Sequence, residues 1–467
     1  MRPGKTVAQA AAVAVPCVVA IAGAVALAVW LSAVPTVALV ERVPSAEPAV
    51  LPGATPAAVV GKFAKSDGTP ADLPGSWPRF RGPNLDNISP EQTPLARTWP
   101  EGGPTVLWSL DLGEGYAGAA VLNGRVYLLD YDHAGQADVL RCLSLADGRE
   151  IWRHFYSVEI KRNHGMSRTV PAVTGKYVVA IGPKCHVTCL DSTTGAFKWG
   201  IDLVRQYGTK VPPWYAGQCP LIDGNRAIIA PGGRFLMIAV DLETGAAIWK
   251  TPNLNGWQMS HSSIVPMELA GRRTYVYCGN GGVAGISADD GSIVWQTTDW
   301  RINIATVPTP VIVGSNRIFL TGGYNAGSMM LELKNDGGTI TPRTIFRLTP
   351  NVFGCEQQTP IFYQGNIYGV IAGGQLACLS PDGKQLWSSG QQRKFGLGPF
   401  MIAGGMIYVM NDTGQLTIVE ASPAGCKQLA QAQVLQGHDS WGPMAIAGGR
   451  LIVRDLTKMV CLDVRGN

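Results

Sequence analysis

The stretch Val187-Thr-Cys-Leu-Asp-Ser-Thr-Thr-Gly-Ala-Phe-Lys-Trp199 returns about fifty residues later as Ile238-Ala-Val-Asp-Leu-Glu-Thr-Gly-Ala-Ala-Ile-Trp249. In both copies a β-prone run leads into an Asp-x-x-Thr-Gly turn, and a tryptophan follows the turn. The tryptophans at this position are Trp108, Trp152, Trp199, Trp249, Trp295 and Trp387, and the first four steps are 44, 47, 50 and 46 residues. The last gap is 92 residues, two steps, with Phe346 near its middle. A period in the forties built from short strands predicts a propeller.

Each unit contains four short β-prone runs separated by Gly, Pro, Asp and Ser/Thr turns, which is typical of an antiparallel sheet. One such sheet cannot bury both of its faces alone, so the units must stack around an axis. Counting the second run of each unit gives eight. The eighth unit lacks a fourth strand, and residues 106–110 supply a strand that has no unit of its own. The sequence therefore predicts an all-β, eight-bladed β-propeller closed by an N-terminal strand, with seven blades as the alternative.

The N-terminus is apolar. Residues 6–40 carry no charged side chain, and residues 10–34 alone give 25 mostly apolar positions, enough to span a bilayer. This length favours an N-terminal transmembrane helix over a cleaved signal sequence, whose apolar core is shorter. Because Arg2 and Lys5 precede the run, we expect the propeller to lie on the extracytoplasmic, periplasmic side of the cell membrane. We therefore divide the chain into an anchor or signal sequence (1–40), a Pro/Ala-rich linker (41–75) and a propeller (76–464).

Charge excludes one class of partner. The chain carries a formal net charge of +5, only 15% of its residues are charged, and it has no long basic run. We therefore expect no nucleic acid as partner. The propeller part also has no motif of a nucleophile elbow, a zinc protease or a phosphate loop.

Four of the cysteines occupy one repeat position. Cys142, Cys189, Cys378 and Cys461 fall at the same place in the third strand of four units, where Ala239 stands in another. A position that accepts Cys or Ala is small, buried and apolar, so we expect these thiols to fill space. Equivalent positions in different blades lie too far apart to form a disulfide. For the other cysteines of the propeller, the sequence does not decide whether a disulfide forms.

The segments that enter the first strand of each unit approach the central channel of a propeller, and here they are rich in polar and aromatic residues. One hypothesis is a water-filled channel mouth, and a second is a site for a ligand or peptide. The candidate ligand-binding residues are His164, Arg168, Trp214, Tyr215, Gln218, Trp257, His261, Glu356, Gln357 and Trp441. The histidines come from blades spread around the ring, so we expect no metal site and no catalytic residue among them.

The two quoted stretches resemble the pyrroloquinoline-quinone (PQQ) repeat. That repeat builds eight-bladed propellers in quinoprotein alcohol dehydrogenases and in BamB-type factors of outer-membrane protein assembly. The resemblance covers roughly residues 76–464, and the segment Trp77-Pro-Arg-Phe-Arg-Gly-Pro-Asn84 resembles the entry segment of membrane-anchored relatives. It is specific for the fold and weak for activity.

The two branches of the family imply different functions. The dehydrogenases carry an adjacent cysteine pair and a calcium site of Glu, Asn and Asp, and this sequence has no Cys-Cys pair. The BamB branch matches in size and compartment. The resemblance therefore implies a non-enzymatic binding or scaffolding module without a cofactor, whose partners are other envelope proteins or a small ligand in the central channel. The alternative is an oxidoreductase that uses PQQ with calcium.

Overall fold

The computed structural model describes residues 5–32 and 57–466 of the chain. They fall into two compact units, divided after Val50. In the first unit the helix α1 (Lys5–Ser32) confirms the predicted apolar helix. Its segment Ala14–Ser32 is long and apolar enough to cross a membrane, a property that membrane anchors share with signal sequences. The predicted linker residues 41–56 lie outside the described residues.

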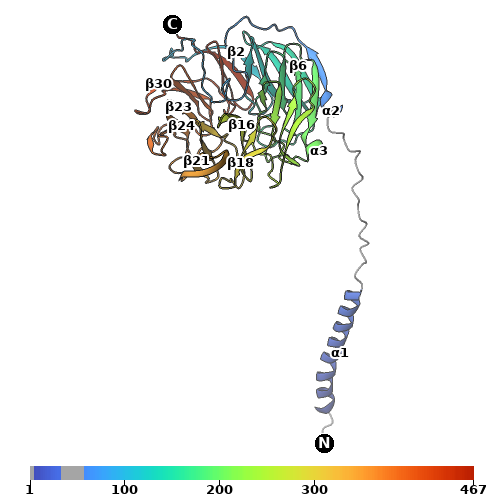
Figure 1. Cartoon of the computed structure of the whole chain (residues 1–467). Helices are drawn as coiled ribbons and strands as arrows, with labels where there is room; N and C mark the ends of the chain where they lie inside the picture. Colours follow the sequence, from blue (N-terminus) through green and yellow to red (C-terminus); the bar gives the residue numbers. More distant parts are fainter. Residues whose placement is uncertain (1–4, 33–56, 467) are drawn as a thin grey trace. The chain divides into compact units, whose positions relative to one another are not determined.

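The second unit is an eight-bladed β-propeller, as the repeat predicts. The labels β2, β6, β18, β21, β23 and β30 follow one another around a ring in Figure 1. In the first four blades, the four strands run in chain order from the axis to the rim. Their bounds are, for blade 1, β3 (Ala120–Leu122), β4 (Arg125–Asp132), β5 (Ala137–Ser144) and β6 (Glu150–Ser157); for blade 2, β7 (Ala172–Val173), β8 (Tyr177–Ile181), β9 (His186–Asp191) and β10 (Phe197–Asp202); for blade 3, β11 (Leu221–Asp223), β12 (Arg226–Ile229), β13 (Phe235–Asp241) and β14 (Ala247–Pro252); and for blade 4, β15 (Val265–Leu269), β16 (Arg272–Gly279), β17 (Gly282–Ser287) and β18 (Ile293–Thr297).

The remaining four blades have the same order, except that blade 8 takes its outer strand from the N-terminal side of the propeller. Their bounds are, for blade 5, β19 (Val311–Val313), β20 (Arg317–Gly322), β21 (Gly327–Asp336) and β22 (Thr339–Leu348); for blade 6, β23 (Ile361–Tyr363), β24 (Asn366–Val370), β25 (Leu376–Leu379) and β26 (Gln385–Ser388); for blade 7, β27 (Phe400–Ala403), β28 (Met406–Met410), β29 (Gln415–Glu420) and β30 (Gln428–Gln433); and for blade 8, β31 (Ala445–Ala447), β32 (Arg450–Arg454), β33 (Lys458–Asp463) and β2 (Thr105–Asp111). A short helix, α3 (Leu203–Tyr207), links blades 2 and 3.

The predicted closure of the ring is confirmed. Strand β2 pairs antiparallel with β33, and Trp108 lies opposite Cys461. The guanidinium of Arg454, which is 1% exposed, reinforces this joint because it donates to the backbone oxygens of Gly113 and Ala117 beside blade 1. Closure removes the open sheet edge between the two ends of the propeller.

At five of the eight joints, the repeated aromatic residue docks one blade onto a glycine of the next. The ring of Trp199 lies against Gly245 in the Asp-x-x-Thr-Gly turn of blade 3, where an added Cβ would come within 2.7 Å of the ring. Its Nε1 donates to the backbone oxygen of Leu242, 2.8 Å away. Trp108, Trp152 and Trp249 cover the corresponding glycines Gly148, Gly195 and Gly291, and Phe346 covers Gly383. In the fifth unit, a phenylalanine therefore makes the contact with the next blade that a tryptophan makes elsewhere.

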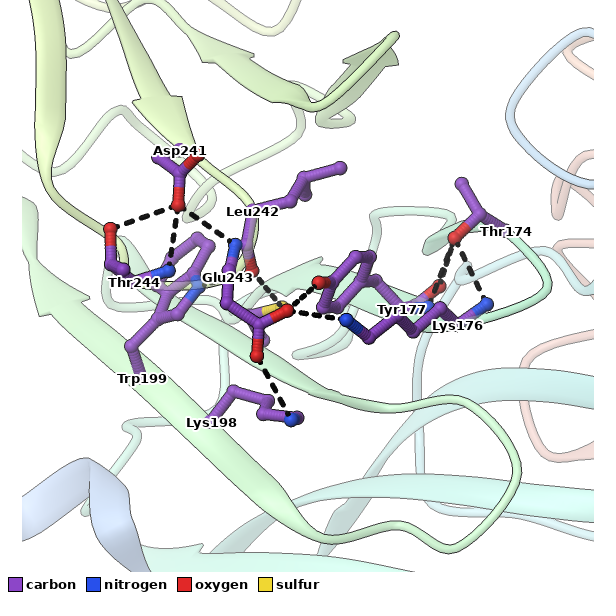
Figure 2. A network of polar contacts seen from close by, with 10 residues as sticks. Thr174, Lys176, Tyr177, Lys198, Trp199, Asp241, Leu242, Glu243 and Thr244 are labelled. Atoms are coloured by element: carbon purple, nitrogen blue, oxygen red, sulfur yellow. Dashed lines mark hydrogen bonds and ion pairs between the residues drawn. The ribbon is translucent and has the colours of Figure 1, made fainter.

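Polar contacts surround the joint between blades 2 and 3 (Figure 2). The Oδ1 atom of Asp241 accepts the backbone N–H groups of Glu243 and Thr244, so it holds the turn in shape. The carboxylate of Glu243 reaches back to blade 2 and accepts from Lys176 and Tyr177. These groups lie on the surface, so the apolar contact of the tryptophan with the glycine supplies most of the stabilisation.

The small position of the third strand lies directly across from the docking tryptophan. The pairs are Cys142 with Trp152, Cys189 with Trp199, Ala239 with Trp249, Cys378 with Trp387 and Cys461 with Trp108. All five small residues are fully buried. All ten cysteines of the chain, each within the described residues, are free thiols. Burial raises the pKa of the Cys142 and Cys461 thiols to about 12, so both remain protonated and apolar.

Part of the predicted linker is folded, which corrects the sequence-based expectation for residues 57–75. The N-terminal strap, residues 57–66, consists of α2 (Ala57–Val60) and β1 (Lys62–Lys65). Strand β1 adds a fifth strand to the outer edge of blade 1 by pairing with β6. Val59 is fully buried, and His154 Nε2 lies 2.8 Å from the Val60 oxygen. Main-chain pairing with an open strand edge orders a segment whose composition alone indicates a spacer.

The glycine of the docking turn gives a test of the joint. Gly245 and Gly224 have similar backbone angles, with φ of +71° and +60°, but a Cβ at Gly224 meets nothing within 4 Å. Both Gly→Ala substitutions therefore carry the cost of the left-handed conformation, about 1–2 kcal/mol. Gly245→Ala must also displace the Trp199 ring, so we expect it to destabilise the protein by about 1–3 kcal/mol more. Denaturant unfolding measures both, and equal losses would contradict the docking role.

Candidate functional site

A cavity of about 360 Å³ lies where the first strands of the blades converge. All eight blades contribute to its wall, mostly from segments that precede their first strands, so it lies on the propeller axis. We call it the axial cavity. Its lining residues are Phe80, Arg81, Asn87, Tyr116, His164, Arg168, Trp214, Gly217, Cys219, His261, Val307, Tyr324, Gln357, Gln358, Thr359, Leu397, Pro399, Phe400, Trp441, Pro443 and Met444.

Residues 77–91, the floor segment, run beneath the axial cavity. Hydrogen bonds join this segment to six blades: Trp77 to Val121, Pro78 to Val173, Arg79 to Ile222, Arg81 to Thr359 and Pro360, Asn87 to Ile402, and Glu91 to Gly448. These partners lie on or beside the first strands and their following turns, whereas the rest of the wall comes from loops at the other end of the same strands. The cavity is therefore a cup whose floor is a segment of the chain itself.

One side of the wall is a column of three side chains. The Cζ atom of Arg168 lies 4.9 Å from the ring centroid of Tyr116, and the Tyr116 ring stacks on Trp441 at 5.3 Å. Two carboxylates hold this column from behind. Asp439 accepts the Tyr116 hydroxyl at 3.2 Å, and Asp412 accepts Trp441 Nε1 at 2.7 Å. The stacked rings and the cation are thus fixed in position before any ligand arrives.

The loops around the mouth of the cup are held in unfavourable backbone conformations. His164, Trp214 and Tyr324, which all line the cavity, have φ of 54°, 61° and 54°. Bulky residues rarely adopt the left-handed region, and each instance costs on the order of 1–3 kcal/mol. Arg168 stabilises two of these loops, because it donates to the backbone oxygens of Trp214 and His164. Strain of this kind concentrates at ligand-binding positions rather than at passive solvent channels.

Two polar groups of the wall have no partner within the described residues. The Nε2 atom of His261 and the side-chain amide nitrogen of Gln357 are buried and make no hydrogen bond. Burial, and then the nearby charge of Arg168, lower the pKa of His261 to about 4, so its ring is neutral at physiological pH. Leaving such groups unpaired costs about 1–3 kcal/mol each.

The charge of the cavity is positive. Burial lowers the pKa of Arg81 and Arg168 to about 10, and both remain charged at neutral pH. Among the residues that the structure describes, no aspartate or glutamate lines the cavity. In the described ranges 5–32 and 57–466, no group of three or more His, Cys, Asp or Glu side chains is arranged to hold a metal ion.

The structure brings together six of the ten residues that the sequence proposes. His164, Arg168, Trp214, His261, Gln357 and Trp441 line the axial cavity. Tyr215 is buried beside the cavity in a cluster with Tyr131, Ile160 and Met166. Gln218 is fully buried. Its side-chain amide donates to the Ala230 backbone oxygen and accepts from the Ala230 backbone N–H. Gln218 therefore holds the first two strands of blade 3 together.

Trp257 and Glu356 lie elsewhere. Trp257, proposed as a wall of the channel mouth, is 4% exposed and packs in the core between blades 3 and 4. Its ring lies against Gly281 and Gly282, which are small enough to admit it. Trp257 is therefore a packing residue in this structure. Glu356 faces a second, more polar cavity with Lys394 and Asp412.

Sequence reasoning missed part of the cavity. Phe80, Arg81 and Asn87 come from the floor segment, and Tyr116 precedes the first strand of blade 1. The floor segment carried one signal, the motif around Trp77, but nothing in that motif indicates that it crosses the axis. Tyr116 precedes the first strand of blade 1, as the candidate residues precede the first strands of other blades. Applying the same criterion to blade 1 would have identified it.

Comparison with known proteins supports the predicted resemblance. The family model described as outer membrane protein assembly factor BamB matches residues 135–345, which run from blade 1 to blade 5. Over these blades the chain is thus similar to BamB-type PQQ-repeat propellers. No curated protein matches the sequence.

Three solved structures illustrate the range of relatives. BamB from Moraxella catarrhalis is 16% identical, with a TM-score of 0.53, over 77% of this chain and 99% of that chain. The quinohemoprotein alcohol dehydrogenase ADHIIG from Pseudomonas putida HK5 is 12% identical, with a TM-score of 0.55, over 85% and 81%. A europium-containing methanol dehydrogenase is 11% identical, with a TM-score of 0.57, over 82% and 89%. At these identities the likeness shows the shared fold alone.

The neutral state of His261 predicts a pH dependence. Its pKa is about 4 when folded and 6.5 as an unperturbed group, so the unfolded chain binds the extra proton between these values. Stability is therefore lost as pH falls from 6.5 towards 4, by up to about 3 kcal/mol from this group. We expect the melting temperature of His261→Gln to fall less than that of the wild type when the pH is lowered from 7.5 to 4.5. His438→Gln, at a side chain that is 74% exposed, is the control and should follow the wild type.

Proposed function

We propose that this protein is a non-enzymatic binding module, in which a tethered propeller recognises a partner or ligand through the mouth of the axial cavity. The observation that carries the proposal is the cup itself. Eight blades and a floor segment build a cavity with fixed aromatic walls, strained loops and unpaired polar groups, the features of a preformed binding site. No carboxylate of the described residues lines it to serve as a general acid or base.

The same proposal places the propeller on the extracytoplasmic side of the membrane. Arg2 and Lys5 precede the apolar span Ala14–Ser32, and positive charges favour the cytoplasmic end of a span. The match to the BamB model supports a role in the envelope, in which the propeller helps to assemble or organise other envelope proteins. Cytoplasmic exposure of the propeller in a protease-accessibility assay would contradict this placement.

The alternative is a quinone-dependent oxidoreductase, because two of the structural relatives are dehydrogenases. PQQ with calcium would need oxygen ligands for the ion, and Ca²⁺ takes six to eight of them, chiefly carboxylates and carbonyls. Among the described residues, the lining of the axial cavity offers the amide side chains of Asn87, Gln357 and Gln358 but no carboxylate, and its two arginines repel a cation. This mismatch favours the binding role.

A photo-crosslinking experiment tests which face binds. Tyr324 lies at the mouth, and Gln364 lies in the turn between β23 and β24, at the floor end of blade 6. Both are exposed, and both have positive φ, 54° and 47°. We expect p-benzoylphenylalanine at position 324 of the full-length, membrane-bound protein to give a discrete adduct, and the same group at 364 to give none.

Two further results complete this test. Trp441→Ala, which removes a wall of the cavity, should abolish the adduct at 324 without loss of the folded protein. An adduct at 364 alone, or dye-linked alcohol oxidation by the purified protein after addition of PQQ and calcium, would contradict the proposal.

A further inference from the structure

We propose that the axial cavity binds the ring of an acidic sugar, a hexuronic acid that is free or that terminates a glycan. This inference rests on the proposed binding function and names the ligand class of the same cavity. It follows from the side chains of the wall, the free N–H group of Arg168 and the floor segment.

Aromatic and polar side chains are combined around the cup. Blades 1, 3, 5, 7 and 8 and the floor supply aromatic rings, and blades 2, 4 and 6 and the floor supply polar groups. The aromatic residues are Tyr116, Trp214, Tyr324, Phe400, Trp441 and Phe80, and the polar residues are Arg81, Asn87, His164, Arg168, His261, Gln357, Gln358 and Thr359. A ligand that satisfies this wall has apolar faces and polar groups around its whole edge. A pyranose ring has this pattern, since its C–H groups form the faces and its hydroxyls the edge. A flat aromatic acid carries its polar group on one edge only.

The unbalanced charge selects the acidic form of the sugar. Arg168 donates hydrogen bonds to the backbone oxygens of Asn163, His164, Gly165 and Trp214, none of which carries a charge. Within the described chain its Nη1 group makes no hydrogen bond, so that group is available to a ligand. Arginine suits a carboxylate because its N–H groups match the two oxygens.

The unpaired groups of blades 4 and 6 select hydroxyls. His261 Nε2 and the Gln357 amide nitrogen belong to blades 4 and 6, and each is buried without a partner in the described residues. A hydroxyl both donates and accepts, so it satisfies either group whichever way the imidazole and the amide are protonated or oriented. A ring with several hydroxyls recovers the cost of both groups at once.

The blind floor defines how the sugar is presented. Because the floor segment closes one end of the channel, a glycan enters only from the mouth and only by its terminal residue. A volume of about 360 Å³ lies at the low end of ligand-pocket sizes and suits one or two sugar rings. A long polymer lying across the propeller would not use these residues.

A matched panel of small ligands tests the inference by isothermal titration calorimetry of the full-length protein in detergent. Methyl β-D-glucuronide should bind at least ten-fold more tightly than methyl β-D-glucoside, which lacks only the carboxylate, and than benzoate, which lacks the hydroxyls. A trigalacturonate that binds as well as methyl galacturonide, its matched monomer, would indicate a glycan end, and a three-fold or greater loss would indicate a free sugar acid. Equal binding of glucuronide and glucoside, or tighter binding of benzoate, would overturn the proposal.

A charge substitution places the ligand in the cavity. Gln357→Glu removes no hydrogen bond of the amide nitrogen and sets a negative charge on the wall, so glucuronide binding should fall by at least ten-fold. Gln357→Lys should retain binding. Gln296→Glu, the same change at an exposed position of β18, should leave it unaltered. If the two charged variants at 357 behave alike, the sugar lies elsewhere and the proposal fails.

The outcomes separate this inference from the proposed function. If a partner is crosslinked at position 324 and no sugar acid binds, the protein is a binding module and the proposed ligand class is wrong. If sugar acids bind and no partner is crosslinked, the scaffold role is wrong and the cavity is a glycan site. If neither occurs, both are wrong.

Discussion

The contact that recurs at five of the eight joints of this structure is the packing of an aromatic ring from one blade on a glycine of the next. A four-stranded antiparallel sheet leaves two apolar faces that must be covered by neighbours, so the propeller is stable only when each blade docks on the following one. The glycine gives the ring a flat surface, and its left-handed backbone closes the Asp-x-x-Thr-Gly turn. A single residue type therefore serves both the turn within a blade and the joint between blades.

The difference between the repeated packing residues and the segments between blades explains where the candidate site lies. The rim and the turns are fixed by the repeat, and their residues are constrained by packing. The segments that lead into the first strands are outside the repeat, so their side chains are free to differ from blade to blade. They converge at the axis, where Arg168, Tyr116 and Trp441 form an ordered column although they come from blades 2, 1 and 8. Regular scaffolds commonly carry function on such variable segments.

The floor segment changes what the channel can do. An open channel through a ring of blades lets water pass from face to face, but residues 77–91 bond to six blades and close one end. Arg81, which is 4% exposed, donates to four backbone oxygens and holds this crossing in place. The cavity thereby acquires a single entrance and a positively charged interior, two properties that the repeat by itself does not supply.

The sequence by itself determined the architecture. The spacing of the tryptophans, the turn motif and the unpaired strand at residues 106–110 suffice for eight blades and their closure, because each reports a local contact that recurs at a fixed interval. The tertiary structure decided which of the candidate residues share the site. Trp257 and Trp214 precede first strands in the same way, yet one packs against Gly281 and the other lines the cavity. Only the path of the backbone through the mouth loops, with Trp214 in the left-handed region, sets that difference. The floor and the N-terminal strap escape sequence reasoning because their partners lie far along the chain and no period links them.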